Sequence, residues 1–477
     1  MTSITSHIGI LKHPQHFRDI SFVEKYFFWR TQLDFYTNVG ILAEYSTTIT
    51  PEKLYQALTN MLYKYSALTM TLVPDKDNLE LGYHFNIADS IKLSDIAEFI
   101  NDDSFENNPE LILNTFKNEK FIYGTTKQLW RLKIINSKYV HFYFDHILFD
   151  GTSGKNFHIK LSNELEKEIL PIVSDQFNGL NSIIFDRSLV DDTFKVSPKP
   201  NEIIYYGGSF GSAIYKLLVG LFPKNLGRLL KYWFSGSPYY NIMNYDIISF
   251  KDIKINSEKE NSCKIINLSS TQLDSLIKLS RSHNVKLTSL MVILSHMSAG
   301  KYIANTGKDT VTSVPVNIRN IINEKHAKSL DKHYTSLFGL YMSFVAIDLP
   351  VITKLCPNDE INWSVVQYVH QYIHKFAKDS PLDLGLLKYI NVKRYISRKY
   401  KDEEMPSLEL SNVGMIGSEH KNIVNAWFDQ PSQLFSVNMI STQNGGTMVL
   451  RVKNTEWVDG FKDGLEKLIL SLIPQTD

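Results

Sequence analysis

The stretch HFYFDHILFDGTSGKNFH, residues 141–158, places a histidine and an aspartate four residues apart at the end of a hydrophobic segment. Residues 130–135 and 139–144 are rich in β-branched and aromatic side chains, and Asn136-Ser137-Lys138 between them predicts a β-hairpin. His146 then follows the second strand, where a side chain can face a cleft. Because an imidazole with an ordinary pKa near ~6.5 can accept a proton at neutral pH, His146 is a candidate general base.

The residues behind His146 predict a turn into a helix. Asp150 can orient the imidazole or hold the turn together, and Gly151 allows a backbone conformation that a Cβ atom would oppose. Thr152 or Ser153 can cap a helix whose apolar residues repeat every four positions across 157–169. The same residues also fit an ordinary strand–turn–helix junction with an incidental histidine, so local chemistry alone leaves both interpretations open.

Further elements are predicted along the rest of the chain. Thr50 can cap a helix that begins at Pro51. A strand beginning at Cys263 precedes a strongly apolar helix at 286–304. Near the end, Gln443-Asn444-Gly445-Gly446 between two apolar runs predicts a second hairpin. Strands therefore alternate with helices in both halves of the chain, which indicates an α/β (α+β) protein.

The length of the chain and its composition divide it into parts. With 477 residues, the chain is too long for one compact core at roughly 100–200 residues per domain. Residues 191–212 are rich in Pro, Gly and Ser, which favours a connecting segment. We therefore expect one lobe at 1–190, a linker at 191–262 and a second lobe at 263–477.

Composition narrows the class of protein. A hydrophobic fraction of 43% suits globular cores, and a net charge of +1 gives no reason to expect nucleic-acid binding. Two cysteines cannot form a disulfide framework, which suits a reducing compartment. The N-terminus lacks the pattern of a secretory signal, and no apolar run reaches the ~18–20 residues that span a bilayer. These observations predict a cytoplasmic protein that is soluble or lies at a membrane surface.

Other catalytic chemistries fit the sequence less well. His141, Asp145, His146 and Asp150 cluster, but a strand places the two histidines on opposite faces, and no CxxC or HExxH supports a metal site. The string closest to a nucleophile elbow, at 208–212, has the wrong spacing for a serine hydrolase. Both cysteines are most simply ordinary thiols. We therefore expect no metal and no covalent nucleophile.

His146-Ile-Leu-Phe-Asp150-Gly151 matches the H-x-x-x-D-G motif of the CoA-dependent acyltransferases of the chloramphenicol acetyltransferase type. Nearly the whole chain resembles the fungal alcohol O-acetyltransferases within that superfamily. The segments that carry the resemblance are 22–39, 130–132, 314–320, 410–414 and 434–458. Two features depart from related families. Asp145 stands where condensation domains carry a second histidine, and the plant D-F-G-W-G motif is absent, with LSNVG at 410–414 as its nearest equivalent.

The resemblance implies a chloramphenicol acetyltransferase-like fold, with two lobes that each contain a mixed sheet flanked by helices and a tunnel between them. His146 would act as the general base, and Asp150, beside Gly151, would pair with Arg319 and hold the loop. Ser411, Asn412 and Ser436 become candidates for substrate or oxyanion contacts.

The resemblance also implies a reaction and its partners. Acetyl-CoA would be a co-substrate, with no permanently bound cofactor, and a hydrophobic alcohol would be the acceptor of a monomeric enzyme. An N-acetyltransferase of a long-chain or sphingoid-like amine would need the same base and remains an alternative. A non-catalytic lipid- or acyl-binding member of the fold is a second alternative, disfavoured by the intact His146 and Asp150.

Residues 214–234, IYKLLVGLFPKNLGRLLKYWF, form a basic amphipathic segment. Two interpretations fit it. Its helices can pack over the acceptor tunnel, or its apolar residues can enter a lipid surface while its cations lie near anionic head groups. The second interpretation predicts peripheral association with an endoplasmic reticulum or lipid-droplet surface.

Overall fold

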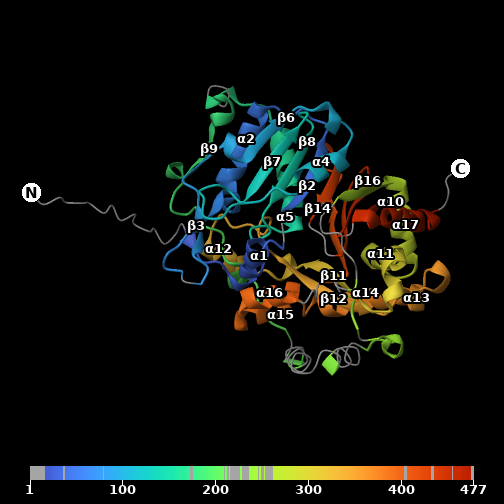
Figure 1. The fold of residues 1–477 in the computed structure, drawn as a ribbon. Helices are drawn as coiled ribbons and strands as arrows, with labels where there is room; N and C mark the ends of the chain where they lie inside the picture. The colour runs from blue at the N-terminus through green and yellow to red at the C-terminus, as the bar shows by residue number, and fades with distance from the viewer. Residues whose placement is uncertain are drawn as a thin grey trace, which may run out of the picture.

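Two mixed β-sheets, each flanked by helices, form the centres of two lobes that lie side by side (Figure 1). The computed structural model describes residues 17–35, 38–78, 80–171, 176–208, 210–211, 214, 226–227, 236–244, 246–248, 252, 262–401, 406–430, 434–453 and 455–473. The two-lobed mixed α/β fold expected from the sequence is confirmed.

The first sheet has five strands in the order β14-β2-β8-β7-β6. Its strands are β2 (Val39–Tyr45), β6 (Ala97–Ile100), β7 (Trp130–Ile135), β8 (Tyr139–Phe144) and β14 (Ile423–Asp429). Smaller sheets beside it are built from β1 (Phe17–Arg18), β3 (Met70–Pro74) and β4 (Tyr83–Ile87), and from β5 (Ser90–Lys92) and β9 (Ile183–Asp186). The helices of this lobe include α2 (Pro51–Lys64), α3 (Leu93–Ile96), α4 (Pro109–Phe116), α5 (Gly151–Leu165) and α7 (Pro200–Ile203).

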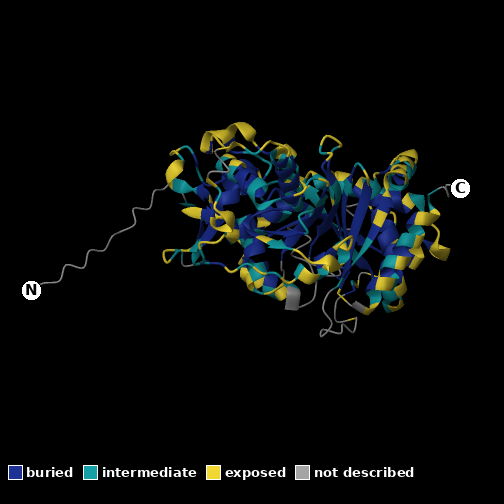
Figure 2. Cartoon of the chain, turned by 90° about the horizontal axis from the view of Figure 1, so that it is seen from above, coloured by how far each residue is buried: buried dark blue, intermediate teal, exposed yellow. Residues whose placement is uncertain are grey.

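The second sheet has six strands in the order β10-β16-β15-β13-β11-β12. Its strands are β10 (Cys263–Ser269), β11 (Thr310–Asn317), β12 (Met342–Leu349), β13 (Leu408–Met415), β15 (Phe435–Thr442) and β16 (Gly445–Val452). Its outer face is covered by α10 (Ser270–Ser282), α11 (Leu287–Ile303), α14 (Trp363–Ala377) and α17 (Val458–Ser471). Figure 2 shows that the sheets are buried, whereas exposed residues lie mainly on the outer helices and loops.

The remaining helices are α1 (Phe22–Gln32), α12 (Glu324–Leu330), α13 (Ile352–Leu355), α15 (Pro381–Gly385) and α16 (Val392–Lys401). α12 contacts α7 of the first lobe, and α13 contacts α11 of the second. In Figure 1, α15 and α16 lie close to α1, below the first sheet, and α1 packs against both. These helices therefore bring a part of the second half of the chain onto the first lobe.

Local sequence signals account for several elements. The β7–β8 hairpin forms as predicted, with Asn136 and Ser137 at positive φ in its turn. Thr50 accepts a hydrogen bond from the Lys53 amide and caps α2, as expected. The expected cap of α5 at Thr152 or Ser153 is wrong, because Asp150 accepts from the Ser153 amide and caps the helix itself. A carboxylate one residue before the helix satisfies the same open amides.

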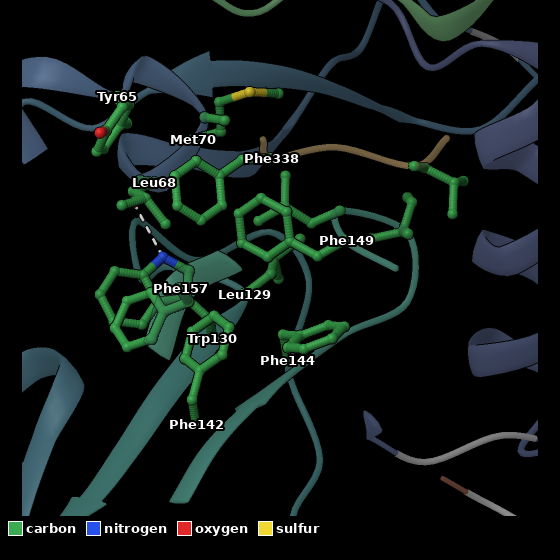
Figure 3. Close-up of a cluster of buried hydrophobic side chains, with 14 of the residues drawn as sticks. Tyr65, Leu68, Met70, Leu129, Trp130, Phe142, Phe144, Phe149, Phe157 and Phe338 are labelled. Carbon is green, nitrogen blue, oxygen red and sulfur yellow. Dashed lines mark hydrogen bonds between the residues drawn. The ribbon is translucent and has the colours of Figure 1, made fainter. Parts of the chain in front are cut away.

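Aromatic side chains fill the core next to the loop that carries His146 (Figure 3). The rings of Phe142 and Phe157 stack at 3.8 Å between centroids, which joins β8 to α5. The Trp130 indole N–H donates to the Leu68 carbonyl, which satisfies the polar edge of a fully buried ring. Phe338, from the second half of the chain, lies among these rings. The core of the first lobe is therefore not made by the first half alone.

The lobes are joined by strand exchange and by a buried ion pair. β14, which follows β13 in the chain, leaves the second sheet and pairs antiparallel with β2 of the first. Asp429 at the end of β14 accepts from Arg451 of β16, with Nε–Oδ1 at 2.6 Å and Nη2–Oδ2 at 2.5 Å. Both side chains are buried. This pair fixes the end of β14 against the second sheet.

The connection between the lobes is partly packed. Phe194, Val196, Ile203 and Ile204 are buried in the core of the first lobe, although the sequence indicated a linker from residue 191. The division at residues 190 and 263 stays a prediction. The basic segment 214–234 lies outside the described residues except at Ile214, Leu226 and Gly227. Within the described residues, no helix combines the length and the apolar character needed to cross a bilayer.

We predict that Asp429→Asn lowers the free energy of unfolding by ~3–5 kcal/mol, because it strands the buried Arg451 guanidinium without its counter-ion. Asp34→Asn is a matched control, since it breaks an exposed pair with Lys120 whose side chains are 71% and 55% exposed. That change should cost less than about 1 kcal/mol. Equal losses for both variants in denaturant titrations would contradict a structural role for the buried pair.

Candidate active site

His146 lies in the short loop between β8 and α5, and a hydrogen bond within this loop fixes its tautomer. The ring Nδ1 is 2.8 Å from the Phe149 carbonyl oxygen. Because a carbonyl only accepts, Nδ1 carries the proton, and in the neutral ring Nε2 is the basic nitrogen. The loop therefore presents an imidazole whose second nitrogen can accept a proton.

The surroundings of His146 keep its imidazole neutral. His146 is 6% exposed, and the Phe27 ring of α1 lies against its imidazole at 4.2 Å between ring centroids. Burial lowers the pKa of His146 to about 4, with a further contribution from the positive charge of Arg30 and an opposing one from Asp150. The ring is therefore unprotonated throughout the neutral pH range.

A cavity of about 280 Å³ lies at the junction of the lobes, with His146 in its wall. Apolar side chains form much of the lining, including Tyr26, Phe27, Val311, Pro315, Met342 and Phe344. Polar and charged side chains form much of the rest, including Arg30, Lys399, Glu409, Ser411 and Gln430. A cavity that combines apolar walls with converging polar groups is the usual form of a small-molecule site.

Asp150 is the most heavily hydrogen-bonded carboxylate near His146. The expected pair with Arg319 is present, with Nη1–Oδ2 and Nη2–Oδ1 both at 2.9 Å. The Tyr341 amide donates to Oδ2, and the Ser153 amide and hydroxyl both donate to Oδ1. Burial alone would raise the pKa of Asp150, but the charge and hydrogen bonds of Arg319 outweigh it and lower that pKa. Asp150 is thus an ionised anchor between the loop, α5 and the second half of the chain.

The reason for a glycine at position 151 differs from the one expected. Gly151 is the first residue of α5 and is not among the residues with positive φ, so no special backbone conformation is required. Instead, an added Cβ would lie 2.7 Å from Val413 Cγ1 and 2.8 Å from Phe428 Cζ. Gly151 is therefore needed for space, because β13 and β14 approach the start of α5 closely.

The three candidate substrate or oxyanion residues occupy different places. Ser411 lines the cavity, and its hydroxyl accepts a hydrogen bond of 2.7 Å from the Gln430 amide nitrogen. Asn412 also lines the cavity, but its side chain contacts Thr288 and the Gly414 amide. Ser436 is fully buried on β15, paired in register with Glu409, and is not among the cavity-lining residues.

Arg30 and Gln430 at this site were missed by sequence reasoning. Arg30 is the single arginine of the aromatic segment FVEKYFFWR, and an arginine among aromatic residues is a usable sequence signal. In the structure Arg30 is buried. Gln430 directly follows β14, and its role depends on the strand exchange that brings it to β13. Its amide nitrogen also donates to Glu409 at 2.6 Å. No local pattern predicts contacts of that kind.

His141, Cys263 and Cys356, which the sequence offered for other chemistries, are all buried. In the part of the chain that the structure describes, no three His, Cys, Asp or Glu side chains group as metal ligands. His141 is buried within β8, where burial lowers its pKa to about 3. Burial also raises the pKa of Cys263 to about 12 and raises that of Cys356, so both thiols remain protonated and weakly nucleophilic.

The sequence and the fold of this chain are similar to those of known acyltransferases. Residues 19–470 match the family model described as alcohol acetyltransferase. An uncharacterized protein of Schizosaccharomyces pombe is 22% identical over 455 residues, which cover 90% of each chain. Among solved structures, the trichothecene 15-O-acetyltransferase of Fusarium sporotrichioides superposes with a TM-score of 0.64 at 9% identity, covering 96% of this chain and 98% of that one. The first condensation domain of the CDA synthetase gives 0.57 at 11% identity, covering 96% of both.

We predict that Asp150→Ala and Arg319→Ala each lower the thermal midpoint, because each leaves a buried charge without its partner; such losses reach ~3–5 kcal/mol. The double variant should be less damaging than the sum of the two. Strict additivity in this double-mutant cycle would reject direct coupling. Since the pKa of Asp150 is lowered on folding, its contribution is present above its unfolded pKa and is lost as the pH falls through the folded value.

Proposed function

Since this chain belongs to the alcohol acetyltransferase family, we propose that it transfers the acetyl group of acetyl-CoA to the hydroxyl of a hydrophobic alcohol. The observation that carries the proposal is a neutral, tautomerically fixed His146 in the wall of a cavity between the two lobes. Family membership supports the acetyltransferase activity and the CoA co-substrate. The choice of acceptor and the roles of individual residues are proposed here.

In the proposed reaction His146 acts first as base and then as acid. Nε2 accepts the proton of the acceptor hydroxyl as its oxygen attacks the thioester carbonyl. The resulting tetrahedral oxyanion collapses with cleavage of the carbon–sulfur bond, and the imidazolium returns the proton to the CoA sulfur. Holding both substrates beside the imidazole makes the transfer effectively unimolecular, so no acyl-enzyme is required.

We propose that Ser411, which lines the cavity, donates a hydrogen bond to the reacting group. Its oxygen accepts from the Gln430 amide nitrogen, and that nitrogen also donates to Glu409. With a lone pair of Ser411 engaged, its own O–H remains available as a donor. We propose that this hydroxyl stabilises the oxyanion, a contribution that costs little reorganisation because Gln430 already orients the side chain.

The lining of the cavity supports a hydrophobic acceptor. β11 and β12 contribute Val311, Pro315, Met342 and Phe344, and α1 contributes aromatic rings next to His146. Burial of an alkyl chain against these side chains would gain roughly 0.8 kcal/mol per CH₂ group. Longer alcohols should therefore bind more tightly until the cavity is filled.

We predict that His146→Ala lowers kcat by at least about two orders of magnitude while the protein remains folded. A thiol assay for CoA release, run over a panel of alcohols and long-chain amines, measures the loss and identifies the acceptor. His326→Ala, Cys263→Ala and Cys356→Ala serve as controls and should retain activity. Near-normal turnover of folded His146→Ala would reject the base, and loss of activity in a cysteine variant would favour an acyl-enzyme.

We further propose that the protein associates peripherally with lipid surfaces, where hydrophobic alcohols concentrate. Tyr205, Phe210 and Tyr389 are largely exposed, and residues 206–208 pack against α15. The neighbouring α16 exposes Lys393 and Arg394. Exposed aromatic rings and cations near one another suit an anionic interface.

The basic segment of the sequence provides the test of this association. Changing Lys216, Lys224, Arg228 and Lys231 to Gln should release the protein from anionic liposomes in flotation, at ~1 kcal/mol per cation. A control variant changes four exposed helix-borne or helix-flanking lysines elsewhere, Lys64, Lys167, Lys278 and Lys467. Unchanged flotation of the first variant, or equal release of both, would argue against an interfacial role for the segment.

A further inference from the structure

We propose that Asp145, the residue directly before His146, is the positioning residue of the active-site loop, and that its ionised carboxylate is required to hold the histidine in its reactive orientation. This inference rests on the proposed function, in which His146 is the base. Asp145 stands where condensation domains carry a second histidine, so the resemblance assigns it no role.

Hydrogen bonds from Asp145 shape the loop around His146. Oδ1 accepts from the Ile147 amide at 2.9 Å, and the Asp145 carbonyl accepts from the Leu148 amide at 3.1 Å. These two bonds turn the backbone on both sides of His146. The Asp145 amide donates to the Leu129 carbonyl at 2.9 Å, which ties the turn to the start of the hairpin. The two backbone bonds would form with any residue at this position, so the side chain of Asp145 acts on the loop through its bond to the Ile147 amide, directly after His146.

The second carboxylate oxygen connects the loop to neighbouring elements. Oδ2 accepts from the Tyr123 hydroxyl at 2.8 Å, and the Thr31 hydroxyl of α1 lies 3.5 Å from Oδ1. α1 also carries Phe27, whose ring lies tilted against that of His146, and Arg30, whose charge acts on the imidazole. The polar or titratable groups around the Asp145 carboxylate are therefore those of Tyr123, Thr31, Arg30 and His146.

Stability alone does not explain an aspartate here. Asp145 is fully buried, and its negative charge is held by an amide and two hydroxyls. Burial raises the pKa of Asp145 to about 6, against the opposing effect of those hydrogen bonds. A group whose pKa is raised on folding favours its protonated form, so the folded protein loses stability as the pH rises through this range. A neutral side chain of the same shape would be tolerated better.

The ionised form has a geometric advantage that a neutral one lacks. A carboxylate accepts on both oxygens at once, so it can hold the Ile147 amide and the Tyr123 hydroxyl together. When Asp145 is protonated on Oδ2, the Tyr123 hydroxyl must turn its own proton away and accept instead, and the charge-assisted bond between the two groups is lost. The loop should therefore lose its reactive geometry at a pH well above the point at which His146, with a pKa of about 4, becomes protonated.

The test is the pH dependence of kcat/KM for the alcohol, measured at saturating acetyl-CoA so that titration of the CoA phosphates does not enter. In the wild type, activity should fall below about pH 6. Asp145→Asn should lower kcat/KM about 10- to 100-fold at pH 8, since small misplacements of a base are costly, and its remaining acid limb should move to lower pH. Tyr123→Phe should move the limb to higher pH, because it removes a donor that stabilises the carboxylate.

Tyr143→Phe is the matched control, because burial raises the pKa of Tyr143, the charges of Lys133 and Glu119 then modify it, and Asp145 is not among the causes. It should leave the acid limb unchanged. Thermal midpoints at pH 8 give a second measurement, in which Asp145→Asn should be at least as stable as the wild type. An unchanged acid limb in Asp145→Asn, or a less stable Asp145→Asn with unaltered pH dependence, would overturn the inference. Absence of His146-dependent acetyl transfer in the wild type would instead reject the proposed function.

Discussion

The bidentate pair between Asp150 and Arg319 is the contact on which the arrangement of this site depends. Asp150 follows the histidine loop, caps α5 and accepts from the Tyr341 backbone, while Arg319 begins the segment after β11 and reaches back across the junction. Arg319 also donates to the Ser336 carbonyl at 2.7 Å. One buried pair thus joins a loop, a helix terminus and a segment 169 residues away. Because each charge is satisfied only by this geometry, other placements of the loop would strand a buried ion.

Burial of His146 has two opposing consequences for catalysis. Because burial lowers the pKa of His146, the ring is neutral over the whole neutral pH range and Nε2 can accept a proton. The same lowered pKa makes the imidazole a weaker base than in water. A weak base is useful when the acceptor oxygen and the thioester are held at reacting distance, and when the developing charges are met by fixed dipoles. The fixed tautomer, the Phe27 ring and the oriented Ser411 hydroxyl all serve that requirement.

Much of this arrangement could be predicted from short-range pattern. The hairpin, the helix after Gly151 and the position of His146 follow from alternation, turn residues and helical spacing, and the motif resemblance added the pair of Asp150 with Arg319. What could not be predicted depends on long-range contact. The crossing of β14 to the first sheet and the spatial reason for Gly151 arise from segments separated by hundreds of residues. Gln430 contacts residues only 19 and 21 positions earlier, but on a strand of the other sheet. Asp145 was visible in the sequence, but its Tyr123 partner comes from a loop without regular pattern.

The contacts between the lobes combine apolar packing with two buried ion pairs. Each lobe has an apolar core, and a third apolar cluster joins Leu42 and Tyr139 of the first sheet to Val449 of the second. The junction also holds the pairs of Asp150 with Arg319 and Asp429 with Arg451. Ion pairs of this kind add little net stability compared with well-packed apolar side chains, because the desolvation of both ions offsets their attraction. They do, however, penalise every other alignment of the two sheets. An enzyme that must bring two substrates together between lobes gains from this property, since the rate of transfer depends on placement within about an ångström.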